Sequence, residues 1–309
     1  MSISIPNSPI TTHQSPSTTS DFITLLKPRV MSLVVFTGLV GMLLPLIAGY
    51  GHINLFQQII TVSCIALASG AGGAMNMWYD RDIDAIMNRT KNRPIPAGRV
   101  VADDALAFGL FLSAFSVMVM GLALNWVAAS ILAFAIFFYV VIYTILLKRS
   151  TPQNIVIGGA AGAFPPIIGW AAVTGDVTLQ SFILFLIIFL WTPPHFWALA
   201  LYKNDDYRRA KIPMMPVVAG TKHTKKLMLI YTYILAVCSL SLPLLNMAGI
   251  VYSGCALLLN VVFVHHIYKI ELNNVDKWAR KTFYFSILYL FVLFSAIIVD
   301  GLFLQLIRN

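Results

Sequence analysis

The run NMWYDRDIDAIMNRTKNRPIPAGR, which begins at Asn76, gathers charged side chains in a chain of which only 11% is charged. Asn76, Asp80 and Asp84 stand at positions i, i+4 and i+8, so on a helix they share one stripe about 12 Å long. Asp82 is two residues out of phase and is expected to point elsewhere, where Arg81 or water satisfies it. The three stripe residues can therefore converge on one ligand.

Oxygen ligands with no cysteine or histidine nearby favour a hard cation, and few carboxylates that leave room for phosphate oxygens and water favour Mg²⁺ over Ca²⁺. Just downstream, Arg89, Lys91 and Arg93 supply positive groups of the kind that bind a diphosphate. A solvated loop end with ordinary salt bridges would also explain any single aspartate. The stripe followed by the basic run predicts a magnesium site beside a diphosphate clamp.

The elements that must position these residues are predicted to be membrane helices. The chain has 309 residues, of which 59% are hydrophobic, and its mean hydropathy of +0.81 lies far above that of soluble domains. Nine apolar runs, of roughly 20 residues each, are long enough to cross a bilayer. They lie near residues 30–50, 56–78, 105–123, 127–147, 155–174, 180–201, 227–246, 250–268 and 282–305. We therefore predict an all-α, polytopic membrane protein whose nine transmembrane helices form a bundle around a central cavity.

The distribution of positive charge predicts the orientation. Of 21 lysines and arginines, all but Arg308 fall on one side of the apolar runs. Because basic loops stay in the cytoplasm, the N-terminus is predicted inside and the C-terminus outside. Carboxylates are costly at the bilayer centre, so the stripe is expected at the cytoplasmic end of the second span, in a cavity that opens to the cytoplasm. The net charge of +9 is then a topology signal, and we predict no nucleic-acid binding.

The first twenty residues are rich in Ser, Thr and Pro and contain neither a basic residue nor an apolar signal core. We predict a disordered cytoplasmic tail over residues 1–26 and a single transmembrane domain over residues 27–309. Without an Arg-rich presequence, the expected location is a bacterial inner membrane.

Acidic residues followed by basic ones recur at residues 202–220, at the end of the sixth apolar run, in YKNDDYRRAKIPMMPVVAG. We call the run from Asn76 the first copy and this run the second copy. Asp205 and Asp206 correspond to the first acidic cluster, and a basic run follows them. Both copies end on the same predicted side, which indicates a parallel duplication of the first four and the next four spans around one cavity. This arrangement suits the ionisation of an allylic diphosphate, because Mg²⁺ and basic groups stabilise the leaving diphosphate while the pocket keeps water from the carbocation.

The run from Asn76 resembles the NxxxDxxxD signature of the intramembrane prenyltransferases of the UbiA superfamily. Together with KRSTPQNIVIGGAAGAFPPIIGW at 148–170 and WTPPHFWALALYKNDDY at 191–207, it resembles the haem-modifying branch of that superfamily. The likeness extends over nearly the whole chain after residue 25. It implies a nine-helix bundle that transfers the farnesyl group of farnesyl diphosphate to a vinyl group of haem b (protohaem IX). The product would be haem O, with a haem A synthase or a haem-copper terminal oxidase as possible partners.

The resemblance also implies roles for single residues. Asn76, Asp80 and Asp84 would hold Mg²⁺ and diphosphate, and Arg89 and Arg93 would contact the diphosphate. Many members of the superfamily have DxxxD as their second motif, whereas this chain has tyrosine at the first position. The haem-modifying members likewise lack that first Asp. A symmetric site with two magnesium ions is therefore not implied. We expect the second copy to contribute Asp206 as a metal ligand and Lys203 as a positive charge.

Candidate haem contacts lie in the other two blocks. His195 follows two prolines about two helical turns before the end of the sixth span. It can ligate the haem iron, hold a propionate, or be a buried histidine bonded to a carbonyl that the prolines free. Its place in the haem-branch block favours a substrate contact, with Trp197 and Asn154 as further candidates. Lys148 can meet the diphosphate or a propionate, although topology anchoring explains its charge equally well, as it does for Lys27.

Two other functions are compatible with parts of the pattern. An aromatic prenyltransferase acting on a quinone precursor would share the first motif, but His195 and the altered second motif favour the haem branch. A membrane transporter would be expected to place its acids near the bilayer midplane and to show inverted repeats. The cytoplasmic acids and parallel repeats predicted for this chain are not typical of transporters.

Overall fold

The computed structural model describes residues 17–270 and 274–308, and within these ranges the chain folds into helices without a β-strand. The first sixteen residues of the predicted tail lie outside the described residues. Within the described ranges, nine helices are long and apolar enough to cross a membrane. The nine predicted spans are thereby confirmed by length and composition.

The nine spans follow the chain in order, with one short helix before the first span and two short helices between spans. The spans are α2 (Pro28–Ile47), α3 (Leu55–Tyr79), α5 (Ala102–Ala123), α6 (Trp126–Phe137) with its π-helical continuation η1 (Phe138–Leu147), α7 (Asn154–Gly158) with α8 (Ala160–Thr174), α9 (Leu179–Tyr202), α11 (Met215–Leu240), α12 (Ile250–Tyr268) and α13 (Val275–Arg308). The short helices are α1 (Thr19–Leu25), α4 (Arg81–Ile86) and α10 (Asn204–Arg209), and one 3₁₀ turn, η2 (Pro243–Leu245), follows α11.

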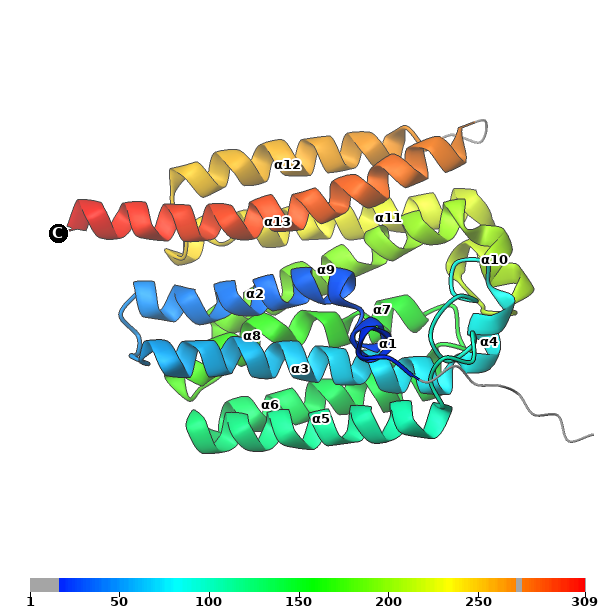
Figure 1. The fold of residues 1–309 in the computed structure, drawn as a ribbon. Coiled ribbons are helices and arrows are strands. Elements are labelled where there is room, and N and C mark those ends of the chain that lie inside the picture. The colour runs from blue at the N-terminus through cyan, green and yellow to red at the C-terminus, as the bar shows by residue number, and fades with distance from the viewer. Residues whose placement is uncertain (1–16, 271–273, 309) are drawn as a thin grey trace, which may run out of the picture.

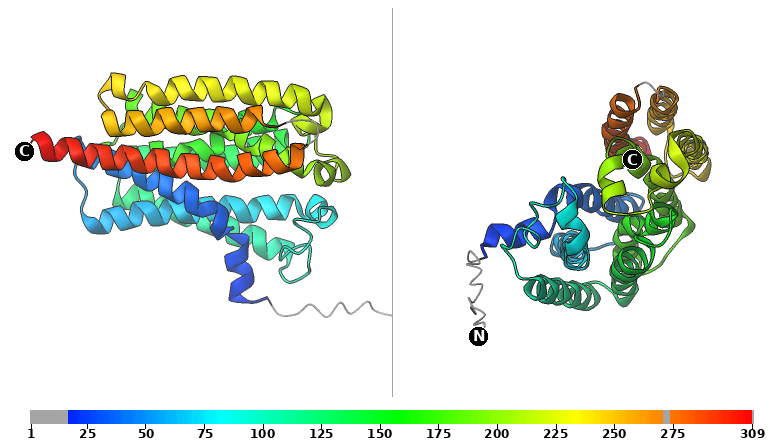
Figure 2. Two further views of the ribbon diagram at one scale, coloured as in Figure 1. Left: turned by 90° about the horizontal axis from the view of Figure 1, so that it is seen from above. Right: turned by 90° about the vertical axis from the view of Figure 1, so that its right-hand side faces the viewer.

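The long helices lie side by side, and α4 and α10 lie at the same end of the bundle while the C-terminus lies at the other (Figure 1). Seen end-on, helices that are consecutive in the chain lie next to one another (Figure 2), and α2 also packs against α8 across the bundle. We call the end that carries α4, α10 and the loop after α4 the polar end. Helices α3 and α9 both run toward this end, so the two acidic copies are brought to the same depth.

Close contact between α2 and α8 depends on glycine. A Cβ atom at Gly41 would collide with the backbone of Pro166, and one at Gly169 would collide with the backbone of Gly38. Glycine therefore lets the two helix backbones approach without intervening side chains, as is common between membrane helices. This packing fixes α2, whose polar end supplies a residue of the site described below.

The predicted disorder of residues 1–26 is wrong for its last part, because residues 19–25 form α1. Thr18 and Asp21 form a capping box at its start, which satisfies backbone N–H groups that the first turn leaves free. Leu25 is fully buried beside Ala74 and Met77 of α3. Arg99 also donates to Asp21 at 2.7 Å. Packing and a distant ion pair thus order a segment whose composition alone is typical of a tail.

Candidate active site

The predicted stripe of Asn76, Asp80 and Asp84 is present and buried. Helix α3 ends at Tyr79, and Asp80 joins it to α4, but backbone bonds from Asp80 to Asn76 and from Asp84 to Asp80 preserve the i, i+4 spacing through the junction. The three residues are 4%, 0% and 2% exposed. The Asn76 amide donates to Asp80 Oδ2 at 2.7 Å, so the first two stripe residues already touch.

Two cations from the end of the fourth span meet Asp80. The Lys148 ammonium pairs with Asp80 Oδ2, and Arg149 Nη2 lies 3.4 Å from Asp80 Oδ1. Lys148 directly follows the π-helix η1, a form that often marks functional sites. Within η1, Thr144 accepts a bond from Asn76 Nδ2 at 3.2 Å. The irregular helix thus brings both its own hydroxyl and the lysine onto the stripe.

Lys27 is a further member of the site. Its ammonium donates to Asn76 Oδ1 at 2.7 Å, and its backbone lies in the left-handed region with φ of 55°, which costs a non-glycine residue about 1–2 kcal/mol. Burial, and then the nearby positive charges of Arg93 and Lys148, hold the pKa of Lys27 well below its usual range. The sequence signal for Lys27, a basic residue before a span, is equally typical of topology anchoring, so only the structure assigns it to the site.

Asp84 is held by the loop that follows α4. Arg93 Nη1 lies 2.6 Å from Asp84 Oδ2, and Thr90 donates to the Asp84 carbonyl at 2.9 Å. Arg89 and Lys91, the other two residues of the predicted clamp, are exposed. The structure therefore places one clamp residue on the stripe and leaves two at the surface beside it.

Asp82 is satisfied by a residue that differs from the predicted one. Arg149 donates to both of its carboxylate oxygens, at 2.6 and 2.7 Å, whereas Arg81 donates to the Trp78 carbonyl. The paired guanidinium lowers the pKa of Asp82, and the Asp82 carboxylate in turn raises the pKa of Arg149. The residues lie 67 positions apart, so the pattern of the sequence gives no signal for this pair.

In the second copy, the charged side chains contact residues that are close to them in the sequence. The buried Asp206 carboxylate pairs with Arg209 on the same short helix, and the Lys203 ammonium lies 5.6 Å from the Tyr202 ring centroid. In the part of the chain that the structure describes, no three His, Cys, Asp or Glu side chains gather in a metal-ligating group. Asp206 is therefore not gathered with Asp80 and Asp84 into one such group among the described residues, and its role as a metal ligand stays a prediction.

Packing nevertheless joins the two copies at the polar end. Ile83 and Met87 share one buried cluster with Tyr207 of α10. Burial raises the pKa of Tyr207, and the nearby positive charge of Arg89 opposes the rise. Arg89 therefore lies between the first motif and α10, although its side chain is exposed.

The predicted haem contacts separate into three places. His195 is 7% exposed and lies between the rings of Trp191 and Phe283, with centroids at 4.2 and 4.6 Å. Trp197, two positions away on α9, is fully buried against Tyr231 of α11. Because side chains two apart on a helix point in different directions, Trp197 does not share the surroundings of His195.

Asn154, the third predicted haem contact, lies beside Lys148, which pairs with the acidic stripe. It is fully buried at the start of α7, and its Nδ2 donates to the Lys148 carbonyl at 3.3 Å. Its Oδ1 is buried and has no partner among the described residues. Asn154 therefore supports the backbone of Lys148 and leaves one acceptor available.

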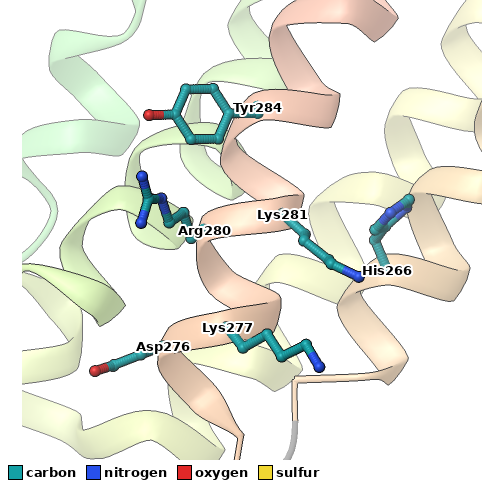
Figure 3. A pocket seen from close by; sticks show the side chains of 6 residues that line it. All are labelled: His266, Asp276, Lys277, Arg280, Lys281 and Tyr284. Carbon is teal, nitrogen blue, oxygen red and sulfur yellow. The ribbon is translucent and has the colours of Figure 1, made fainter.

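A separate hollow of about 600 Å³ lies at the polar end between α12 and α13. Lys277 and Lys281 extend toward the side of His266, whereas Arg280 and Tyr284 point the other way (Figure 3). The hollow is open and basic, and none of its lining residues belongs to the stripe.

The stripe combines two buried carboxylates with four cations that converge from distant segments. Asp84 uses one oxygen in a close ion pair. Asp80 Oδ2 pairs closely with Lys148, while Asp80 Oδ1 has only the longer 3.4 Å contact to Arg149. One oxygen of each carboxylate is thus outside a close ion pair and can serve a hard cation. The surrounding cations are Lys27, Arg93, Lys148 and Arg149. This excess of positive charge favours a ligand that carries several negative charges.

A bundle of membrane helices with a buried, charged site at its polar end is the arrangement of an intramembrane enzyme. The UbiA prenyltransferase family matches residues 34–288, and this chain belongs to that family. It is 56% identical over 286 residues to a protoheme IX farnesyltransferase of Rhizobium rhizogenes, covering 91% of this chain and 88% of the relative. A protoheme IX farnesyltransferase of Brucella anthropi is 54% identical over 292 residues, covering 93% and 92%.

Solved structures share the fold at low identity. A digeranylgeranylglyceryl phosphate synthase superposes with a TM-score of 0.75 at 18% identity, covering 92% of this chain and 98% of the other. A UbiA homologue of Archaeoglobus fulgidus bound to DMAPP and Mg²⁺ superposes with a TM-score of 0.68 at 17% identity, covering 89% and 99%. The UbiA fold predicted from the motif is confirmed.

Proposed function

We propose that this enzyme transfers the farnesyl group of farnesyl diphosphate to a vinyl group of haem b and so forms haem O. Two relatives more than half identical to this chain are named protoheme IX farnesyltransferase. The observation that carries the chemistry is the buried pair Asp80 and Asp84, surrounded by cations that come from several segments. An aromatic prenyltransferase would also need this pair, but the relatives favour the haem acceptor.

The oxygen-only donors of the stripe suit Mg²⁺, and Asp80 and Asp84 would hold it, with Asn76 beside them. When bound, Mg²⁺ supplies positive charge that neutralises the leaving diphosphate. The side chains of Lys148 and Arg93 would bind the diphosphate oxygens, and Arg89 and Lys91 would meet the diphosphate at the surface.

The proposed reaction begins at the diphosphate and ends on the haem side chain. Lys27 would turn from Asn76 toward the diphosphate as negative charge leaves the farnesyl carbon. The C–O bond of farnesyl diphosphate would break, and the vinyl group of haem b would attack the allylic carbon. Water captures the resulting cation on the haem side chain and loses a proton, which accounts for the hydroxyl group of the product.

We further propose the orientation that the charges predict. The polar end would face the cytoplasm of a bacterial cell, with the N-terminus inside and the C-terminus outside the inner membrane. Residues 27–309 would be one catalytic domain with a parallel pseudo-repeat, and the cavity would open to the cytoplasm. A haem A synthase or a haem-copper terminal oxidase would receive the product.

The experiment incubates membranes that contain this protein with haem b, farnesyl diphosphate and Mg²⁺, and follows the extracted haem by mass spectrometry with and without a chelator. We expect a magnesium-dependent increase by the mass of a farnesyl group plus a hydroxyl group. Membranes without the protein serve as the control. Unchanged haem in membranes where the protein is folded would contradict the proposal, and labelled prenyl diphosphate with a quinone precursor would then test the aromatic alternative.

A further inference from the structure

The surroundings of His195 determine which of its ring nitrogens carries the proton. Its Nδ1 lies 2.7 Å from Ser286 Oγ, and the same hydroxyl lies 2.7 Å from the Phe283 carbonyl and is placed to donate to it. A serine hydroxyl has one proton, and a carbonyl has none. Both contacts are attractive only if Ser286 donates to Phe283 and His195 Nδ1–H donates to Ser286.

The proton on Nδ1 leaves a lone pair on Nε2. No acidic side chain among the described residues pairs with the His195 ring, so nothing stabilises a second proton there. Within the described ranges, the His195 ring hydrogen-bonds through Nδ1 alone. The side chain is thus a buried imidazole whose electron pair is available to a ligand.

The aromatic rings that stack on both faces of His195 restrict the direction of the Nε2 lone pair. The ring is inclined by only 18° to Trp191 and 25° to Phe283, so both faces of the imidazole are covered. The Phe196 ring stands at 83° to it with the centroids 5.0 Å apart, so a ligand can approach the imidazole only at an edge. Trp191 is itself fixed, because its indole N–H donates to the Ser286 carbonyl at 2.7 Å. The Nε2 edge is therefore held in one direction by α9 and α13 together.

We propose that His195 Nε2 is an axial ligand of the haem iron and that Ser286 is the positioning residue that fixes its tautomer. The proposal rests on the proposed function, because it takes haem b as the substrate. Imidazoles that bind metals almost always donate their other N–H to a fixed acceptor, which is the role of Ser286 here. Binding is dative: the Nε2 lone pair enters the iron coordination shell, and no proton or electron is transferred.

The position along α9 supports a substrate role. His195 lies eight residues before Lys203, which is about 12 Å along a helix from the polar end. An iron bound there would hold the macrocycle among apolar side chains, while the propionates could extend toward the basic polar end.

The test records absorption spectra of the purified protein titrated with ferric haem b in the absence of farnesyl diphosphate. The wild type is expected to give the spectrum of an imidazole-ligated haem. His195→Ala should lose that spectrum and bind haem at least about tenfold more weakly, and added imidazole should restore the spectrum. A His195→Ala spectrum identical to that of the wild type would overturn the proposal, because water or packing would then account for the site.

Two variants of Ser286 test whether its hydroxyl positions the His195 ring. Ser286→Ala should weaken haem binding about ten- to a hundredfold and shift the spectrum, whereas Ser286→Thr keeps the hydroxyl and should resemble the wild type. The bond from Trp191 goes to the Ser286 backbone, so neither variant removes it. A Ser286→Ala protein that is only less stable, with an unchanged haem spectrum, would reduce Ser286 to a structural role and overturn its part of the proposal.

A matched control is His266→Ala, because the His266 Nδ1 is also hydrogen-bonded, in this case to the Val262 carbonyl, and its ring also stacks on a phenylalanine of α13. This variant should keep the wild-type spectrum, and a loss there would instead identify His266 as the ligand. Mass spectrometry of haem after turnover separates the two proposals. Wild-type ligation without haem O would contradict the proposed function alone, whereas haem O formation with an unaltered His195→Ala spectrum would contradict ligation alone.

Discussion

The two acidic copies end equivalent helices but are held by different kinds of contact. Helix α3 continues into α4 and helix α9 continues into α10, and α4 and α10 are each six residues long. Asp80 pairs with Lys148, 68 positions away, whereas Asp206 pairs with Arg209, three positions away. In the first copy, Asp80 is thus paired with a residue that is distant in the sequence. In the second copy, Asp206 is paired with a residue of its own short helix.

This difference indicates where a ligand can act. The Asp80 carboxylate is fully buried and shares its cations with the rest of the stripe, so a bound cation or anion would rearrange charges from several helices. The partner of Asp206 is about half exposed, and such local pairs contribute little. Similar sequence motifs at equivalent positions therefore do not make equivalent sites.

The largest expected effect comes from breaking the first copy. Asp80→Asn should reduce haem O formation by about a hundredfold or more, because it removes a magnesium ligand and leaves Lys148 without its counter-ion. Asp206→Asn, the matched change in the second copy, should cost less than about tenfold. Mass spectrometry of extracted haem measures both, with thermal unfolding as the check on folding. Equal losses would show that the copies act as one symmetric site.

The next largest effect is expected at Lys27, the cation that only the tertiary structure places in the site. Lys27→Met should raise the KM for farnesyl diphosphate about ten- to a hundredfold, because a charge-assisted hydrogen bond contributes about 1.5–3 kcal/mol. Arg29→Met, an exposed change two residues away, should leave the KM close to that of the wild type. Steady-state kinetics at saturating haem distinguishes them. If both variants behaved alike, Lys27 would be a topology anchor only.

The ion pair between Asp21 and Arg99, which lies outside the site, should make the stability of the fold depend on pH. The Arg99 guanidinium, and then Thr18, hold the pKa of Asp21 below its usual range, so this distant pair stabilises the fold most when the carboxyl is ionised. The stabilisation is complete above the unfolded pKa of about 3.9 and is lost as the pH falls through the lower folded pKa. The unfolding midpoint of the wild type should exceed that of Asp21→Asn at neutral pH, and the difference should vanish in acid. A difference independent of pH would contradict the role of the charge.

The smallest effect is expected at Asp205. Its side chain is 85% exposed and lies 4.0 Å from Arg208, at the limit of an ion pair. Asp205→Asn should therefore change stability by no more than about 0.5 kcal/mol and leave haem O formation unchanged. Thermal unfolding and the haem assay are the measurements, and a clear loss of activity would assign Asp205 to the ligand.

Much of the fold could be predicted because lipid imposes simple rules on a sequence. Spans such as 56–78 and 180–201 are readable from hydropathy, since a membrane helix must satisfy its own backbone and cover itself with apolar side chains. Helix α1 escaped prediction because its order depends on Leu25 packing and on Arg99. The stripe from Asn76 to Asp84 was readable from its spacing, but its partners were not.

The sequence by itself determined the class of the protein, its nine spans and the acidic stripe, because apolar length and helical spacing act over short distances along the chain. Only the tertiary structure decided that Lys27 and Lys148 meet the stripe, that Asp206 remains with Arg209, and that Ser286 holds His195. Those contacts join segments far apart in the chain, and their energies depend on burial and on the direction of each side chain. Neither quantity exists until the helices are packed together.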